Sequence, residues 1–495
     1  MQEACVNHRQ SISQILFVSL LWTLLLFSFG YEPVLADESD DNVNEIQDSF
    51  LSKISIGGYL KNETAYRYDE PRSITKIRNI FSLNAQYPLG TRSKLTAGGW
   101  IYYDHVYDLF DYETIVARFV RDEEQPLVFV ENLRQEKDSP VAEIREFYFD
   151  IFTDKMDIRV GKQFVVWGVL EGMRIVDEIN PMDFRELITL DLLDYRVPLW
   201  TLKLDYYGER AAYQMLWIPD IKFHKPAPPG SEWELLQEVT NTKFPDPDDL
   251  SNSELGFKVT KDVLDAEITL SYFYTWDDFP AVFRTVDLNA ALDPIFFPTY
   301  TRIHMYGTTF VKSLGATIVK GEIAYVPDKY FGLSNDVDTD DDGFLDSNGE
   351  VQKKHIRWGL GVDFNVWGMD VSPAIAQWVI LDYEEGILQD EFDTSFALFL
   401  RKPMPKKSAV FQLLLINLIN MHEMYIKPKI TFDVTDHFQI ATGFDLFYGA
   451  KSVLGVPATG GVVAGLNLGT VEQSAQFFGN FHDNDRLFLE FKYTF

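Results

Sequence analysis

The chain has 495 residues, of which 46% are hydrophobic, 15% aromatic and 24% charged, and its formal net charge is −31 at pH 7. A chain this acidic lacks the basic face of a nucleic-acid-binding protein, so we expect no nucleic-acid partner. A mean hydropathy of −0.12 resembles that of a soluble protein, but the high aromatic content is typical of a β-barrel, where alternation hides lipid-facing residues among polar ones.

The first 36 residues have the layout of a secretory signal peptide. An apolar run, Ile15–Phe29, follows Arg9, and Val34-Leu35-Ala36 supplies the −3 and −1 positions of a cleavage site. The run is shorter than the roughly 20 residues of a transmembrane helix, and an uncleaved anchor is the alternative. The only cysteine, Cys5, lies inside this segment, so we expect the mature chain to carry no thiol, disulfide or thiolate metal site.

Residues 37–53 form a short acidic segment that we place in the periplasm, and alternating segments then run from Ile54 to the last residue. The clearest is Arg486–Phe495, in which every second residue from Leu487 onward is apolar. A period of two predicts a strand. Its terminal aromatic resembles the signal that outer-membrane barrels present to their assembly machinery, which we expect to be a partner.

About eighteen such segments are predicted, an even number typical of bacterial barrels. They span residues 54–68, 74–87, 94–106, 142–152, 156–168, 199–207, 211–218, 254–260, 264–276, 302–311, 316–326, 356–367, 370–382, 395–401, 408–419, 425–434, 438–448 and 486–495. Eight short joints and both termini fall on one side, and the longer connections fall on the other. This segregation predicts an all-β fold: a transmembrane antiparallel β-barrel over residues 54–495, in the outer membrane of a Gram-negative bacterium.

The polar face of each strand would line the lumen, with both signs of charge mixed around the wall. A barrel of this size holds a water-filled channel unless loops fill it; a plugged interior with paired charges is the alternative. The candidate lumen residues on strands are Glu146, Asp150, Arg159, Lys162, Gln163, Trp167, Lys203, Asp205, Lys258, Lys320, Glu322, Arg357, Asp363, Lys427, Lys429, Arg486 and Glu490.

Lys162 breaks the alternation, because strict periodicity places it among lipid-facing residues. A lysine near the bilayer midplane of a barrel costs about 2–4 kcal/mol. We therefore predict that a bulge at Gly161 turns Lys162 inward, toward Glu146 or Asp150.

The long connection Leu170–Pro198 contains Asp177, Asn180 and Asp183 as further candidate constriction residues. Asn180 followed by Pro181 is a good helix start, so we expect a short helix. It would either fold into the lumen as a constriction or form a surface lid.

A second long connection has the spacing of a calcium loop. Asp338, Asp340 and Asp342 are two residues apart, Gly343 follows, and Asp346 comes four residues after Asp342. In such a loop the aspartates donate side-chain oxygens and Phe344 a backbone carbonyl. The pattern resembles the calcium loops of thrombospondin-like and dockerin repeats, and calcium is the one cofactor that we consider. A solvated acidic loop is the alternative.

The sequence contains no H-E-x-x-H, G-x-S-x-G or phosphate-binding loop. The histidines are scattered, and no pair of side chains marks a catalytic site. We therefore do not expect an enzyme, and an outer-membrane hydrolase is the weakest of our hypotheses.

The stretch Ile158–Asp183 carries a family resemblance. Its Gly161-Lys162-Gln163, its Trp167-Gly168 and its Asn180-Pro181-x-Asp183 resemble the pattern of a group of proteobacterial outer-membrane proteins of unknown function. That group looks related to alginate-exporter-type porins, and it often has arginine where this chain has Lys162. The resemblance implies passive transport across the outer membrane.

Two main hypotheses follow from these patterns. The first is an outer-membrane porin or passive exporter for a small polar or charged solute. The second is a plugged structural or surface-binding barrel whose acidic loops bind calcium. In either case the expected surroundings are outer-membrane lipid and lipopolysaccharide.

Overall fold

A computed structural model describes residues 53–70, 72–106, 141–190, 194–227, 233, 242–286, 294–333, 348–450 and 477–495. The predicted signal peptide lies outside these residues. So do the five candidate calcium ligands Asp338, Asp340, Asp342, Phe344 and Asp346.

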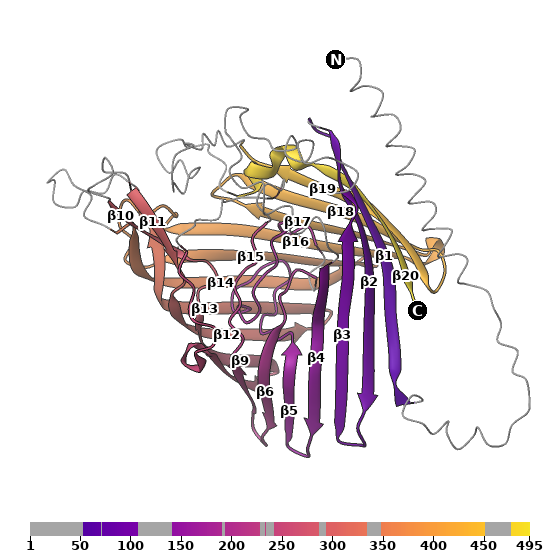
Figure 1. Cartoon of the computed structure of the whole chain (residues 1–495), viewed down its shortest axis with the longest axis horizontal. Helices are drawn as coiled ribbons and strands as arrows, with labels where there is room; N and C mark the ends of the chain where they lie inside the picture. Colours follow the sequence, from indigo (N-terminus) through magenta and orange to yellow (C-terminus); the bar gives the residue numbers. More distant parts are fainter. Residues whose placement is uncertain are drawn as a thin grey trace, which may run out of the picture.

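Eighteen antiparallel strands form one closed sheet (Figure 1). Each strand pairs with its neighbours along the chain, and β1 pairs with both β2 and β20. The strands are β1 (Ser55–Arg67), β2 (Ser73–Pro88), β3 (Ser93–Asp104), β4 (Val141–Phe152), β5 (Met156–Gln163), β6 (Leu199–Tyr207), β7 (Ala212–Ile218), β8 (Glu254–Val263), β9 (Ala266–Trp276), β12 (Arg302–Leu314), β13 (Thr317–Gly332), β14 (Glu350–Val366), β15 (Met369–Ile380), β16 (Phe392–Met404), β17 (Ala409–Leu418), β18 (Glu423–Asp433), β19 (Phe438–Tyr448) and β20 (Arg486–Thr494). The predicted strand number and the predicted closure are confirmed.

Three short 3-10 helices and one additional hairpin complete the described structure. The 3-10 helices are η2 (Leu250–Asn252), η3 (Pro405–Lys407) and η4 (Phe478–Asn484). The hairpin of β10 (Ala281–Val286) and β11 (Pro294–Thr299) forms a separate two-stranded sheet in a region predicted only as a long connection. The N–H of Val282 donates to the Glu350 carboxylate (2.6 Å), so the hairpin docks where β14 begins.

The strands divide their side chains between two faces, as their alternation predicts. On β20, Leu487 and Leu489 are 40% and 36% exposed, whereas Arg486 and Phe488 are 4% and 6% exposed. The same division places a belt of apolar residues on the outside of the sheet. It includes Phe81, Leu83, Ile101, Ile144, Phe147, Val160, Met215, Leu255, Leu270, Ile323, Leu360 and Ile375. A closed sheet pairs every strand hydrogen-bonding group internally, which is what a chain requires inside lipid.

Among the described residues, no helical segment is long and apolar enough to cross a membrane.

Strand ends differ from the predicted ones where the chain meets loops. β5 ends at Gln163 rather than Gly168, whereas β13 and β14 extend several residues further toward the long connections. The carboxyl end of the chain lies at the rim of short turns, because the N–H of Thr494 donates to the carbonyl of His437 (2.8 Å) in the turn before β19. The residues after β5 leave the wall and enter the barrel (Figure 1).

We predict that Gly161→Ala destabilises the barrel. Gly161 has a φ of +136°, and an added Cβ would lie 2.1 Å from the carbonyl oxygen of Phe147 on β4. Backbone strain of this kind costs about 1–3 kcal/mol, and the clash adds to it. The free energy of unfolding, measured by urea titration in lipid vesicles, should fall by about 2 kcal/mol or more. Gly57→Ala is the control, since its added Cβ meets nothing closer than 3.6 Å; equal stability of the two variants would contradict the prediction.

Candidate functional site

The described residues between β5 and β6 (164–190 and 194–198), here called the inner segment, lie inside the barrel (Figure 1). Asn180 ties the two ends of this segment together. Its Oδ1 accepts the N–H of Val165 (2.8 Å), and its Nδ2 donates to the carbonyl of Val197 (2.8 Å). The described residues of the segment form no helix at Asn180, so this prediction is wrong. The side-chain amide of Asn180, which would cap a helix, instead joins two distant stretches of chain.

The first half of the inner segment is apolar and packs on an apolar part of the lumen wall. Its buried side chains include Trp167, Leu170, Ile175 and Val176. The opposing wall is built from small or apolar residues, namely Leu216, Ile218, Phe273, Met305, Ala324, Ala374, Ala376 and Ala397. The predicted lumen was polar throughout, and this expectation is wrong over this part of the wall, because the inner segment shields it from water.

Glycines in the wall make room for this packing. A Cβ added at Gly359 would lie 2.6 Å from Leu170 Cδ1, and one added at Gly307 would lie 3.0 Å from Val176 Cγ1. Both distances are too short for an ordinary carbon contact. While Leu170 and Val176 are present, Gly359 on β14 and Gly307 on β12 must therefore be glycine for the inner segment to fit.

Glu322 on β13 fixes the same half of the inner segment through backbone donors. Its carboxylate accepts the N–H groups of Val169 (2.5 Å), Leu170 (2.7 Å) and Val176 (3.1 Å). Bonds from several N–H groups to one carboxylate are among the stronger hydrogen bonds in proteins. Glu322 was predicted to face the lumen and does so, as a buried anchor for the inner segment.

The polar half of the inner segment is anchored by ion pairs. The Glu186 carboxylate lies 2.9 Å from Lys76 Nζ and 3.5 Å from Arg486 Nη2, and it also pairs with Arg78. Burial raises the pKa of Glu186, but Arg78, Lys76 and Arg486 outweigh it and hold the pKa well below its ordinary value. Glu186 is therefore a permanent anion that joins the inner segment to β2 and β20.

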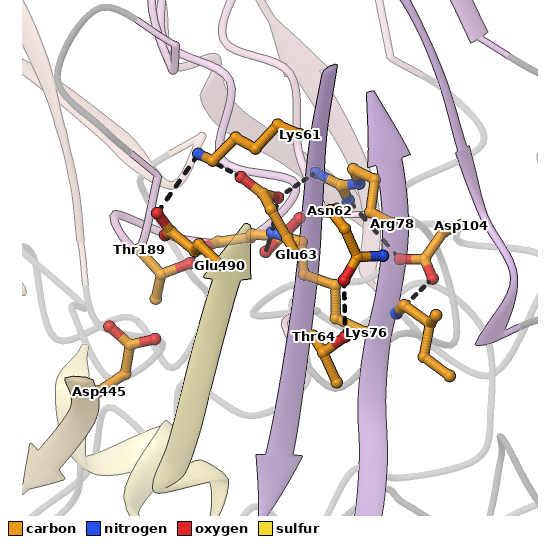
Figure 2. A network of polar contacts seen from close by, with 12 residues as sticks. Lys61, Asn62, Glu63, Thr64, Lys76, Arg78, Asp104, Thr189, Asp445 and Glu490 are labelled. Carbon is orange, nitrogen blue, oxygen red and sulfur yellow. Dashed lines mark hydrogen bonds and ion pairs between the residues drawn. The ribbon is translucent and has the colours of Figure 1, made fainter. Parts of the chain in front are cut away.

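Charged side chains cover the wall facing this polar half. We call them the charged wall: Lys61, Glu63, Lys76, Arg78, Lys427, Lys429, Asp445, Arg486 and Glu490. They come from β1, β2, β18, β19 and β20. Figure 2 shows that several of them, among them Lys61, Glu63 and Arg78, converge on one region of the lumen. Lys61 pairs with Glu63 (2.7 Å), Lys429 with Glu490 (3.0 Å).

Like charges face one another across the closing seam of the barrel. In the pairing of β1 with β20, Glu63 lies opposite Glu490 and Lys61 opposite Lys492. Like charges directly opposite are destabilising. The cations Lys76, from the neighbouring strand β2, and Lys429, from β18 on the other side of β19, offset the repulsion between the two carboxylates.

The remaining predicted site residues form local contacts. Trp167 Nε1 donates to Gln214 (2.6 Å), Lys258 lies over the Trp167 ring, Gln163 donates to the carbonyl of Thr201 (2.9 Å), and Glu146 is in register with Gly98. The ion pairs among predicted residues and their partners are Asp150–Arg159, Asp177–Arg196, Asp183–Arg185, Lys203–Asp205, Lys320–Asp363, Arg357–Glu178 and Arg486–Asp445. Most of the predicted lumen charges are therefore neutralised by a neighbour.

Lys162 is an exception, and its predicted inward turn is wrong. Its register places it opposite Phe147 on β4 and Trp200 on β6, which are 42% and 44% exposed. The bulge lies instead on β4, where the pairing with β3 shifts. Because β5 ends at Gln163, Lys162 lies one residue from the end of its strand. Strict alternation therefore holds at Lys162, because the register of β5 with β4 and β6 does not shift there.

Some functional residues were missed by the sequence analysis. The alternation of β1 places Lys61 and Glu63 on the same face as Ala65, and this pattern could have identified them from the sequence. No pattern marked Glu186 or Lys225. Lys225 belongs to a second stretch inside the barrel, where its carbonyl accepts the N–H of Phe184 (2.8 Å) and its ammonium pairs with Glu143 (3.1 Å).

The closed sheet, its apolar exterior and its occupied lumen define the class of this molecule: an outer-membrane β-barrel. A family model described as "Protein of unknown function (DUF1302)" matches residues 61–210, which include the inner segment. The relation to alginate-exporter-type porins stays a prediction. No curated protein matches the chain.

Solved structures similar to this chain include outer-membrane proteins of three bacteria. OccK8 (OprE) of Pseudomonas aeruginosa has a TM-score of 0.46 and 9% identity, with 90% of this chain and 99% of that chain covered. OccAB3 of Acinetobacter baumannii has a TM-score of 0.45 and 8% identity, with the same coverage. OmpT of Vibrio cholerae, lacking loop L8, has a TM-score of 0.39 and 8% identity, with 89% and 99% covered.

We predict that Glu186→Gln weakens the barrel through the inner segment. The change leaves Lys76, Arg78 and Arg486 without their shared anion, and removing one partner of a buried ion pair costs about 3–5 kcal/mol. Urea unfolding in lipid vesicles should show this loss. The control is Glu70→Gln, because Glu70 and its partner Arg72 have side chains 79% and 64% exposed. An unfolding midpoint unchanged in Glu186→Gln would contradict the anchoring role.

The ion pair between Glu178 and Arg357 predicts an acid-sensitive contribution to stability. Burial raises the pKa of Glu178, but Arg357 and Arg174 lower it to about 2, against an ordinary value of 4.5. A depressed folded-state pKa stabilises the protein above about pH 4.5, and this contribution is lost as pH falls toward 2. The stability difference between the native protein and Glu178→Gln should therefore be constant from pH 8 to 5 and shrink between pH 4.5 and 3. A difference that does not change with pH would contradict this assignment.

Proposed function

We propose that this protein is a passive outer-membrane channel for a polar or charged solute, and that the inner segment is its constriction. The observation that supports this most is the asymmetric filling of the lumen. One side is closed by apolar packing of the inner segment, and the other is bordered by the charged wall.

A pocket lies between the polar half of the inner segment and the charged wall. Thr189 and Leu190 form one side of it, and Lys61, Lys427 and Arg486 are among the residues of the other side. The charged side chains around it match the surface that a hydrated solute requires. In this proposal the solute crosses the barrel along this face.

The anchors of the inner segment support a fixed constriction rather than a gate. Glu322 and Arg357 hold it to β13 and β14, whereas Lys76 and Arg486 hold it to β2 and β20. These strands lie on different parts of the wall. Moving the segment out would break buried ion pairs and apolar packing together. Breaking one buried ion pair alone costs about 3–5 kcal/mol.

Conductance of the purified full-length protein in planar lipid bilayers tests the proposal. We expect discrete, voltage-independent current steps in potassium chloride, since a fixed constriction leaves an open aqueous path. A silent trace at every voltage, from protein whose heat-modifiable gel mobility shows a folded barrel, would contradict a channel and support a plugged barrel.

A disulfide between the inner segment and the wall tests whether the constriction is fixed. A Cβ added at Gly307 would lie 3.4 Å from Cβ of Val176, with the rotatable hydroxyl of Ser271 the other near neighbour. This is close to the Cβ separation of a natural disulfide, about 3.5–4.5 Å, and Val176→Cys removes the Cγ1 atom that would otherwise clash. In Val176→Cys/Gly307→Cys we expect conductance to agree within about twofold before and after reduction. Current that appears only after reduction would show that the segment must move.

A further inference from the structure

We infer that Arg302, on the outer face of the barrel, binds a phosphate group of lipopolysaccharide in the outer leaflet of the membrane. This inference does not depend on the proposed channel, because the residues concerned face the membrane rather than the lumen. It follows from the position of Arg302 on β12, from its contacts with two aromatic rings and from the apolar surface next to it.

Arg302 is the first residue of β12 and faces outward. The strand alternates from this point: Ile303 and Met305 are buried in the apolar cluster that contains the inner segment. Successive side chains of a strand point to opposite faces. Arg302 and His304 therefore lie on the side that faces the membrane.

The length of β12 places Arg302 beyond the apolar belt. The strand has 13 residues, and its other end, Leu314, lies at the rim of short turns. At about 3.3 Å per residue and a tilt of about 40°, Arg302 lies roughly 30 Å from this rim. The apolar belt of an outer-membrane barrel is about 25 Å tall. Arg302 therefore lies at the level where the headgroups of the outer leaflet begin.

Two aromatic rings of β9 hold the guanidinium of Arg302. Trp276 lies directly opposite Arg302 in the pairing of the two strands. The central carbon of the guanidinium is 4.1 Å from the centre of the Trp276 ring and 4.6 Å from that of Tyr274. Aromatic girdles are typical of the edges of the apolar belt, and a planar guanidinium stacks well on such rings. The cation therefore has a fixed position before a ligand arrives.

The charge of Arg302 has no ion-pair partner in the described part of the chain. Its Nη2 donates a long bond to the carbonyl of Ser251 (3.4 Å), and its Nη1, which the protein covers, has no acceptor among the described residues. The outward carboxylate of Asp328 accepts the N–H of His304 (3.0 Å) instead. A partly buried cation without a counter-ion is destabilising. A phosphate would supply the counter-ion and accept charge-assisted hydrogen bonds.

An exposed apolar surface continues from Arg302 toward the short turns. Tyr306, Leu270 and Phe310, each further from Arg302 than the one before, are all exposed on the outer face of β9 and β12. A lipid with its phosphate at Arg302 and its acyl chains along this surface matches both parts. A free phosphate would use only the first part, so the site favours a lipid.

The test measures binding of lipid A, the acylated and phosphorylated part of lipopolysaccharide, to the purified, folded protein by native mass spectrometry. The same lipid with its phosphates removed is the second ligand. We expect the native protein to bind lipid A about tenfold more tightly, since the charge-assisted hydrogen bonds are lost with the phosphate. Arg302→Gln should abolish this preference. Arg92→Gln is the control and should keep it, because Arg92 has a side chain 72% exposed at the rim of short turns.

Equal affinity of the native protein for the two lipids, or an undiminished preference in Arg302→Gln, would overturn the inference. Displacement of lipid A by an equal concentration of inorganic phosphate would also overturn it, because the site would then need no lipid. Heat-modifiable gel mobility shows whether each variant folds. If Arg302→Gln does not fold, Arg302→Lys decides. It keeps the charge but loses the planar donors, so the preference should fall several-fold, and an unchanged preference would overturn the role of Arg302.

Discussion

The structure depends on one constraint: inside a bilayer, the backbone must find all of its hydrogen-bonding partners within the chain. Strands meet this constraint only if the last one pairs with the first, and here β20 pairs with β1. The closing pair sets two carboxylates opposite each other, Glu63 and Glu490. The cations that offset this repulsion come from β2 and β18, and Lys76 also binds Glu186 of the inner segment. The seam and the inner segment therefore share one network of charges.

The inner segment uses two kinds of interaction on its two halves. Its apolar half is held by the hydrophobic effect against small residues of the wall, such as Gly359 and Ala376. Its polar half is held by ions whose partners lie on strands far apart in sequence, such as Lys76 and Arg486. The apolar half removes part of the lumen from water. In the proposed channel, the passage that remains is bordered by charge.

The net charge of the chain does not describe this passage. The protein is strongly acidic as a whole, yet the residues that define the charged wall are six cations and three carboxylates. Screening confines a surface charge to about 8–10 Å at physiological salt. In the proposed channel, a solute in the pocket therefore responds to the charged side chains around it rather than to acidic residues elsewhere.

The sequence by itself determined the barrel. A period of two, repeated about eighteen times with short joints on one side, depends only on each strand having one face in lipid and one toward the lumen. The same local pattern placed Glu322, Lys427 and Arg486 inward, as the structure has them. It also placed Lys162 among the lipid-facing residues, as the structure does; the prediction that failed was the bulge at Gly161 that would have turned Lys162 inward.

Only the tertiary structure decided what fills the barrel. The inner segment has no period, and its bonds join residues far apart in the chain, such as Glu186 with Arg486 or Val176 with Glu322. Asn180 was expected to start a helix, but its amide joins Val165 and Val197 because both ends of the segment meet there. Local alternation reports which face of a strand meets lipid, whereas the path of a segment within a closed lumen is set by contacts with all sides of the wall at once.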